Sequence, residues 1–390
     1  RTRSSSSINV TPTGPSSRNE WREIAGAGQT GISLALVAQG RLVWAEGFGW
    51  ADQEAQRPAT ASTPFAIAST TKTFTTAAMM AMVEDGQLDL DAPANRYLAP
   101  DNLFDDAGPA DGVTLRRLAS HTAGLPTFFL MYPDDEPVSR PSVSTLLRDY
   151  GHLVAPPGEH YEYSNLGMAV VAEIVARRSS RGFSSYVDDR LLRPLGMRDS
   201  VFAPDAARRT HMAASYADDG ARLPFYVTAT PGSGEMFASA RDLATWATFH
   251  LKCSAAAGRA LKDSSLELLH RPVTRADDVT SYGLGWMVCR SSDGWTVLHH
   301  GGGQTGVKAE FVLLPEFRTA ASVLSNRRTN QAFVQSLRDR LIRSAIPGWQ
   351  GLPMGKSAKG PLDSAYVGKW QGSLLAQGRW LPAQLRVAVD

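Results

Sequence analysis

Ser69 and Lys72 lie three positions apart in the segment FAIASTTKTF. On a helix, residues with this spacing share a face, so the lysine amine would stand over the serine hydroxyl. A serine becomes an effective nucleophile when a nearby neutral amine accepts its proton, and the N-terminal end of a helix favours the developing alkoxide. The chain has only 7 lysines, and Lys72 is the only one with a serine three positions before it. The pair is typical of a nucleophile with its base, although two solvated residues on an exposed helix face would give the same spacing.

A second polar cluster is Tyr163-Ser164-Asn165, the only Y-x-N triplet in the chain. It precedes a predicted helix that begins near Leu166. The first and third side chains of a turn can project together, so a phenol and a carboxamide could both face a cleft. The amide could then orient a substrate carbonyl or the lysine amine. Taken singly, Asn165 could instead be the N-cap of the helix, and Tyr163 a core or rim aromatic residue.

A third cluster begins at the end of the predicted strand WTVLHH, with its last residue His300 and the three glycines that follow, Gly301, Gly302 and Gly303. Glycines let a backbone approach a ligand closely, and an exposed N–H there could form half of an oxyanion hole. A turn without a catalytic role would have the same sequence. The 8 histidines show no H-E-x-x-H or other metal-ligand spacing, so we expect no metal or other cofactor.

The elements that must position these clusters follow from hydrophobic periodicity. The segment ISLALVAQGRLVWAEGFG alternates apolar and polar residues around Gln39-Gly40, which predicts a β-hairpin. Residues 69–83 predict a helix that stops before Gly86, so Ser69 would lie at the start of a helix. Residues 91–270 predict helices interrupted by long loops. Within them, the five prolines of residues 127–157 predict a lid or pocket-wall loop.

Strand patterns return near the C-terminal end in YGLGWMV, WTVLHH, KAEFVLLP and TAASVLSN, and the predicted helix QAFVQSLRDRLIRSA follows them. Strands at both ends with helices between them predict an α+β fold. Its antiparallel sheet would be built from both chain ends, with a helical domain inserted. We expect the active cleft where these two parts meet.

Several functional classes are excluded by composition and pattern. The net charge of +2 and the lack of basic blocks interleaved with aromatic residues argue against a nucleic-acid partner. No apolar run approaches the ~20 residues of a membrane-spanning helix. The G-x-G-x-x-G pattern in GAGQTG precedes a strand rather than following one, so it predicts a turn and not a dinucleotide site. Cys253 and Cys289 could form one disulfide or stay free.

Taken together and in this order, the three clusters resemble the signature of the serine β-lactamase-like superfamily: S-x-x-K, then Y-x-N, then K-T-G or H-x-G. This superfamily contains class C β-lactamases, DD-peptidases, D-amino-acid peptidases and esterases of the same fold. Further segments that resemble it are LASHTAGLP, LLRPLGM, SARDLATWA and YGLGW, and the resemblance runs from about residue 21 to 345. His121, in the first of these segments, is interpreted as structural.

The resemblance implies a role for each residue. Ser69 is the acylated nucleophile, Lys72 and Tyr163 share the proton transfers, and Asn165 positions Lys72 and the acyl group. The backbone N–H groups of Ser69 and Gly303 form the oxyanion hole. His300 stands where many β-lactamases carry a lysine.

That difference bears on the substrate. A mostly neutral histidine binds a substrate carboxylate less strongly than a lysine does. We therefore expect a small-molecule ester or a D-amino-acid or peptide amide as substrate. A class C-type β-lactamase, a DD-carboxypeptidase, and a catalytically silent cell-wall peptide binding protein remain as alternatives.

The predicted organisation has four parts. Residues 1–20 form a flexible Ser/Thr/Pro-rich leader, and residues 21–350 form the hydrolase domain, with its α/β part at about 21–90 and 275–350 and its helical part at about 91–274. A linker spans 351–363. Residues 364–390 start a C-terminal β domain that resembles a lipocalin-like barrel, of which only two strands are present. The resemblance and the leader imply export to the periplasm or medium, with a cytoplasmic location as the alternative; the oligomeric state is left open.

Overall fold

The centre of the molecule is an eight-stranded antiparallel sheet. The computed structural model describes residues 31–105, 108–136, 139–254, 260–327, 331–353, 355, 368–376 and 379–387. In spatial order the strands of the sheet are β12 (Thr274–Arg275), β13 (Thr280–Tyr282), β14 (Met287–Arg290), β15 (Thr296–Gln304), β16 (Val307–Leu314), β17 (Thr319–Ser325), β1 (Ile32–Ala38) and β2 (Arg41–Phe48).

This sheet joins β1 and β2 with the strands between residues 274 and 325, so its construction from two distant parts of the chain is as predicted. Strand β1 pairs with β17 in the register Ile32↔Ser325 on one side, and with β2 on the other. The predicted hairpin turn is confirmed, because Gln39 and Gly40 have φ values of 53° and 76°, which suit a two-residue hairpin turn. The expected alternation along β1 is wrong: all seven of its residues are buried.

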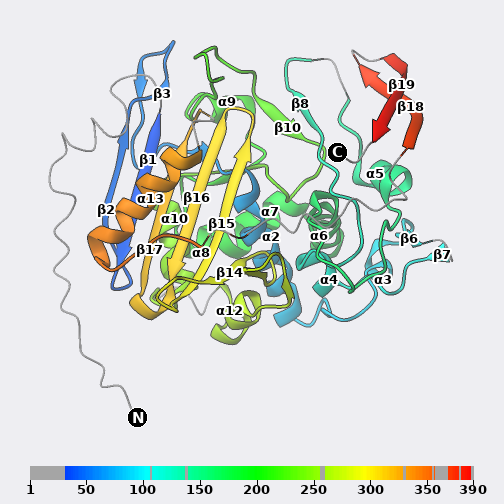
Figure 1. Cartoon of the computed structure of the whole chain (residues 1–390), viewed down its shortest axis with the longest axis horizontal. Coiled ribbons are helices and arrows are strands. Elements are labelled where there is room, and N and C mark those ends of the chain that lie inside the picture. Colours follow the sequence, from blue (N-terminus) through cyan, green and yellow to red (C-terminus); the bar gives the residue numbers. More distant parts are fainter. Residues whose placement is uncertain are drawn as a thin grey trace.

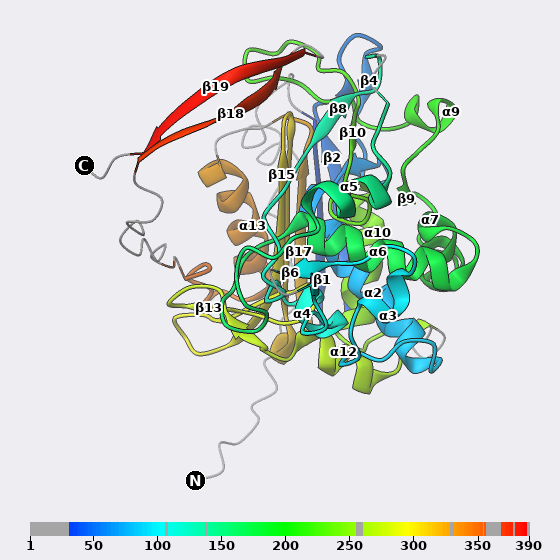
Figure 2. The same ribbon diagram turned by 90° about the vertical axis from the view of Figure 1, so that its right-hand side faces the viewer.

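Strand β1 is buried throughout because helices cover both faces of the sheet (Figures 1 and 2). On one face, α13 (Gln331–Ala345) packs Val334, Leu337 and Leu341 against apolar side chains of β1, β16 and β17. On the other face, α10 (Ala240–His250) contacts β1 and β17. Next to α10 lie α2 (Thr71–Glu84) and α6 (Asn165–Ser179), which pack against each other. The result is a three-layer arrangement in which the central strands β1 and β17 are buried on both faces.

The other elements are short and form the rims of the helical layer. The helices are α3 (Asn95–Leu98), α4 (Leu115–Ala119), α5 (Val143–Tyr150), α7 (Phe183–Val187), α8 (Arg193–Leu195), α9 (Ala206–Arg209) and α12 (Asp263–His270), with η1 (Ala68–Thr70), η2 (Asp188–Leu192) and η3 (Pro315–Phe317). The short strands pair as β3 (Trp50–Asp52) with β4 (Arg57–Pro58), β6 (Phe104–Asp105) with β7 (Gly108–Pro109), β8 (Met131–Pro133) with β10 (Tyr226–Thr228), and β11 (Met236–Ala238) with both β5 (Phe65–Ala66) and β9 (Val201–Phe202).

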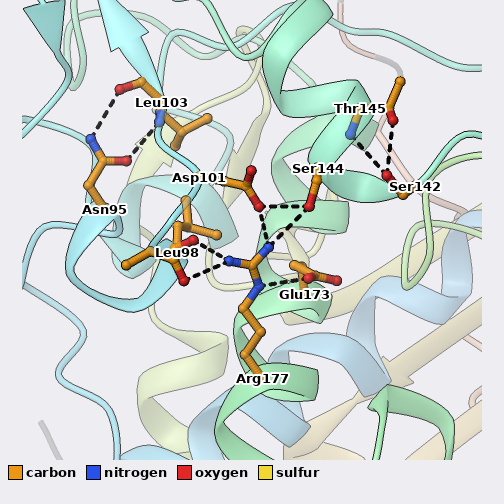
Figure 3. A network of polar contacts seen from close by, with 10 residues as sticks. Asn95, Leu98, Asp101, Leu103, Ser142, Ser144, Thr145, Glu173 and Arg177 are labelled. Carbon is orange, nitrogen blue, oxygen red and sulfur yellow. Dashed lines mark hydrogen bonds and ion pairs between the residues drawn. The ribbon is translucent and has the colours of Figure 1, made fainter.

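The segment predicted as a lid loop, residues 127–157, contains strand β8 and helix α5. Helix α5 is tied to α6 by Arg177, whose guanidinium contacts Asp101, Glu173 and Ser144, as well as the carbonyl oxygen of Leu98 (Figure 3). The Nε to Glu173 Oε1 distance is 2.7 Å. The second half of this segment is therefore a helix anchored to the element that carries Asn165.

Further predictions concern the two chain ends, the cysteines and membrane-spanning helices. Strands β18 (Gly368–Ala376) and β19 (Arg379–Val387) form an antiparallel hairpin, and the idea that it begins a second domain stays a prediction. The leader and the glycines at positions 26 and 28 lie outside the described residues. Cys253 and Cys289 are free thiols. Among the described residues, no helix is long and apolar enough to cross a bilayer.

Candidate active site

Ser69 lies in the tight turn η1, between strand β5 and helix α2. The turn is held by a hydrogen bond of 3.0 Å from the N–H of Ile67 to the carbonyl of Met236 in β11. Ala68, immediately before the serine, has a φ of 44°, a left-handed conformation that costs an L-residue about 1–3 kcal/mol and persists only where the surroundings impose it. Ser69 itself is half-buried. The turn therefore presents the Ser69 hydroxyl two residues before the first residue of α2.

Lys72 is completely buried, and none of its hydrogen-bond partners is acidic. Its Nζ lies 2.8 Å from Asn165 Oδ1, 2.8 Å from the carbonyl oxygen of Ser233 and 3.1 Å from Ser69 Oγ. Burial lowers the pKa of Lys72 well below its ordinary value. A neutral amine has two N–H donors and one lone pair. Because the amide and carbonyl oxygens can only accept, the two N–H groups are used there, and the lone pair is left for the hydroxyl proton of Ser69.

Tyr163 and Asn165 meet Lys72 from the start of α6. The N-cap of this helix is Ser164, whose hydroxyl accepts a 2.9 Å hydrogen bond from the N–H of Gly167, so the alternative that Asn165 caps the helix is wrong. Asn165 is freed to receive the lysine. The ring centroid of Tyr163 lies 4.8 Å from Lys72 Nζ. Burial raises the pKa of the Tyr163 phenol, while its hydrogen bond with Ser69 acts in the opposite direction, so the phenol stays protonated at neutral pH.

His300 lies inside strand β15 and not at its end, since the strand continues through the glycines to Gln304. The expectation of a strand end at this histidine is therefore wrong. Its ring is buried, with Nδ1 2.8 Å from the carbonyl oxygen of Gly301 and Nε2 3.0 Å from the hydroxyl of Tyr282. A carbonyl can only accept, so Nδ1 carries the proton and Nε2 accepts from the tyrosine. Burial, with Lys72 nearby, lowers the pKa of His300 to about 3. His300 is thus a neutral residue with both ring nitrogens engaged.

The three glycines after His300 have different surroundings. A Cβ atom on Gly302 would lie 2.0 Å from the carbonyl oxygen of Ile67, whereas a Cβ atom on Gly303 would meet nothing within 4 Å. A Cβ atom on Gly301 would make only ordinary van der Waals contacts with β16. The hydroxyl of Thr70 also donates to the carbonyl of His300 at 3.2 Å. The lack of a side chain at Gly302 therefore lets β15 lie directly against turn η1, which carries Ser69. The exposed Gly303 faces open space beside this turn.

Three neighbours of the site were not predicted as participants. The carbonyl of Ser233 belongs to a loop with no distinguishing sequence pattern. His121, interpreted as structural, accepts a hydrogen bond from the N–H of Ser164 at 3.2 Å, and its ring lies 4.4 Å from that of Tyr163. Tyr282 lies 4.7 Å from His121 and holds His300. In the sequence, only the family-like segments SHTAGL and YGLGW pointed to His121 and Tyr282.

No candidate metal centre accompanies these residues. In the part of the chain that the structure describes, no group of three or more His, Cys, Asp or Glu side chains is placed to hold an ion. The described site consists of hydroxyl, amine, amide and imidazole groups with backbone amides.

Comparison with solved structures identifies known proteins with a similar fold. The octameric penicillin-binding protein homologue from Pyrococcus abyssi superposes with a TM-score of 0.69 at 22% identity, over 95% of this chain and 94% of that one. A class C β-lactamase gives 0.68 at 17% identity, over 83% and 92%. The chain thus has the mixed α/β fold of these two structures.

The family follows from the sequence. The family model described as Beta-lactamase matches residues 21–345, and the chain belongs to that family. Protein flp of Staphylococcus aureus is 26% identical over 232 residues, covering 57% of this chain and 45% of its own length. The unguisins hydrolase ungD' of Aspergillus campestris is 27% identical over 320 residues, covering 76% of this chain and 58% of its own. The chain spans about half the length of these curated relatives.

Proposed function

We propose that this protein is a serine hydrolase that forms an acyl-enzyme on Ser69 and hydrolyses small carboxylic esters or D-amino-acid and peptide amides. The observation that carries the proposal is the environment of Lys72. A completely buried amine with two acceptor-only partners and no acid is a neutral base, and its remaining lone pair is 3.1 Å from the serine hydroxyl oxygen. A structural lysine on a solvated helix face would have neither the burial nor these partners.

In the acylation step, Lys72 accepts the proton of Ser69 as Oγ attacks the substrate carbonyl carbon. The backbone N–H groups of Ser69 and Gly303 stabilise the oxyanion of the tetrahedral intermediate. When the intermediate collapses, Tyr163 gives its phenolic proton to the leaving oxygen or nitrogen and recovers one from the protonated Lys72. The leaving group departs as a neutral alcohol or amine, and Ser69 remains acylated.

Deacylation reverses these proton transfers, with water in the place of the leaving group. Tyr163 passes its phenolic proton to Lys72 and takes one from the water that attacks the acyl carbonyl. The protonated Lys72 then gives a proton to Ser69 Oγ as it leaves. Asn165 holds the lysine amine in both steps through its Oδ1 contact of 2.8 Å. His121 and Ser164 fix the backbone from which Tyr163 projects.

His300 supports esters and peptide-like amides over β-lactams. With both nitrogens engaged and the pKa lowered to about 3, the ring offers no positive charge at neutral pH to a substrate carboxylate. One relative is named a hydrolase, which is consistent with a hydrolytic activity. A class C-type β-lactamase or DD-carboxypeptidase activity is therefore ranked second.

Replacing Ser69 with Ala tests the proposal. We expect loss of p-nitrophenyl ester hydrolysis and of covalent labelling by a fluorophosphonate, read by intact mass. Removing a single oxyanion donor costs such enzymes about 10²–10³-fold, and loss of the nucleophile should cost more. Turnover or labelling that persisted in S69A would show that Ser69 is not the nucleophile. A wild-type protein that forms no adduct would favour the silent peptide-binding alternative, and a cephalosporin turned over faster than esters or D-alanyl peptides would reverse the substrate ranking.

A further inference from the structure

A cavity of about 160 Å³ begins beside the nucleophile turn. Its wall includes Gly234 and Gln304. A Cβ atom on Gly234 would lie 3.6 Å from the carbonyl carbon of Ala68, the residue before Ser69, and Gln304 follows Gly303 in β15. The cavity therefore adjoins the turn that carries Ser69, on the side of Gln304.

The position of the proton donor decides which part of the substrate lies toward this cavity. Tyr163 is joined to the His300 side of the site through the ring contacts of His121 and Tyr282. The leaving group has to lie next to its proton donor, hence on that side. Gln304 lies four residues further along β15 than His300, beyond the oxyanion donor Gly303. The cavity is consequently on the acyl side of the scissile bond.

The cavity carries a positively charged wall. Two arginines, Arg140 and Arg209, line it together with a single acid, Glu235. The Glu235 side chain is only 8% exposed and accepts one hydrogen bond from Arg140 Nη2. The partner of Arg209 is Asp134, which is not part of the wall. The charges that face the cavity therefore sum to a net positive value.

Arg140 is built to bind a second group. A guanidinium has five N–H donors, and within the described residues only the one donated to Glu235 is used in a hydrogen bond. Its side chain is 32% exposed, while its carboxylate partner is nearly covered. Glu235 thus holds the guanidinium in place by one nitrogen, and the others remain for a ligand. The aromatic rings of Phe225 and Phe237, stacked with centroids 5.1 Å apart, provide an apolar part of the same wall.

We propose that this cavity is the acyl-group subsite and that Arg140 binds a carboxylate at the far end of the acyl chain, which makes acids with a second, anionic carboxylate the preferred acyl donors. This inference rests on the proposed hydrolase function. It also places the positive charge that would bind a substrate carboxylate at Arg140 and not on strand β15, since His300 of that strand is neutral and enclosed. The aliphatic part of such an acyl group would lie along Phe225 and Phe237, with its carboxylate at the guanidinium.

The test compares two p-nitrophenyl esters of similar length, the hemiadipate, which ends in a carboxylate, and the neutral heptanoate. We expect the wild-type protein to show the higher kcat/KM for the hemiadipate. In R140Q, kcat/KM for the hemiadipate should fall by about 10- to 100-fold, the range for a hydrogen bond to a charged group. Turnover of the heptanoate should stay close to the wild-type rate, and the loss should appear mainly in KM.

Two further variants control for folding and for general charge effects. Arg140→Gln leaves Glu235 buried without its partner, so the double variant R140Q/E235Q removes both charges and should show the same loss of preference. Arg148→Gln changes another arginine of the same region, paired with Asp149 and 72% exposed, and should alter neither ester.

The outcomes separate this inference from the proposed function. If neither ester is hydrolysed in a Ser69-dependent way, the proposed function itself is wrong. If the heptanoate is turned over but the hemiadipate is not preferred, or if R140Q lowers both esters equally, the proposed function stands and the carboxylate subsite is wrong. A preference for the hemiadipate that R140Q and R140Q/E235Q abolish would support it.

Discussion

Lys72 is the residue whose charge decides whether the site can act as a base. It is completely buried, with an amide and a carbonyl as acceptors and no carboxylate to balance a positive charge. A protonated amine here would be an unpaired buried cation, which is costly. The same burial keeps the neighbouring phenol of Tyr163 protonated, because an anion would be equally uncompensated. One environment therefore sets up both a neutral base and a neutral acid.

At this scale we predict a pH dependence. Because burial lowers the pKa of Lys72 well below its ordinary value, the amine loses its proton at a lower pH than an exposed lysine does, and it becomes protonated as the pH falls through that lowered value. We expect kcat/KM for a neutral ester to rise with pH along a single ionisation and to level off before the ordinary lysine pKa. In the K72R variant the guanidinium cannot lose its proton, so this variant should lose about 10²–10⁴-fold in kcat/KM, the usual contribution of a general base.

Initial rates across a pH series with p-nitrophenyl acetate measure both effects, and circular dichroism shows whether K72R is folded. A folded K72R enzyme with wild-type activity would refute the assignment of Lys72 as base. A rate that rose only above the ordinary lysine pKa would show that the pKa of Lys72 is not lowered.

At the scale of elements, the site depends on the contact between strand β15 and the turn η1. The strand reaches the turn only because residue 302 has no side chain, and Thr70 then bonds to the carbonyl of His300 at 3.2 Å. The opposing element is α6, which brings Asn165 and Tyr163 to Lys72 and is itself tied to α5 by Arg177. Lys72 is thus contacted by α6 and by the loop at Ser233, while β15 packs against the turn that precedes it.

Two neighbouring glycines give a matched prediction for this contact. In G302A, the new Cβ atom would lie 2.0 Å from the carbonyl oxygen of Ile67, so β15 has to move away from the turn. We expect a lower Tm and a loss in kcat of about 10²–10³-fold, as for a misplaced oxyanion donor. In G303A the Cβ atom meets nothing within 4 Å, and kcat for a small ester should stay near the wild-type value. Equal effects of the two substitutions would contradict the close approach at Gly302.

At the scale of the whole molecule, buried charges join helix α13 to the sheet on the face opposite the candidate site. Arg338 of α13 is 3% exposed and donates to Glu310 of β16 at 3.0 Å, and Lys308 lies 3.3 Å from the same carboxylate. His299 lies near this arginine, whereas the next residue, His300, lies near Lys72. Successive residues of β15 therefore face opposite layers, His299 toward α13 and His300 toward the candidate site.

We accordingly predict that Arg338→Leu lowers stability and leaves catalysis intact. Removing one partner of a buried ion pair typically costs about 3–5 kcal/mol, and Lys308 should keep the loss toward the lower end. Urea unfolding measures the loss, and kcat of the folded variant tests the separation of the two faces. Arg340→Leu, at an exposed position of the same helix, should change stability by no more than about 0.5 kcal/mol. A similar loss in both variants, or a lower kcat in R338L, would contradict this division.

Local patterns were sufficient for the elements whose sequence signal is local. The hairpin at Gln39-Gly40, the end of helix α2 before Gly86 and the sheet formed from both chain ends were all predicted correctly, because turn residues and periodicity encode them directly. Two expectations failed for lack of long-range information. Strand β1 is buried on both faces because α13 and α10 cover it, and strand β15 runs on through its glycines because β16 pairs with them.

The sequence by itself determined which side chains are available, Ser69, Lys72, Tyr163, Asn165 and His300, and in which order they occur. Only the tertiary structure decided their protonation and pairing. Folding removes Lys72 from water and so lowers its pKa well below the ordinary value. Burial, with Lys72 nearby, lowers the pKa of His300 to about 3, and Gly301 and Tyr282 occupy its two nitrogens. Solvent exclusion and hydrogen-bond geometry arise from packing between distant segments, so no local pattern contains them.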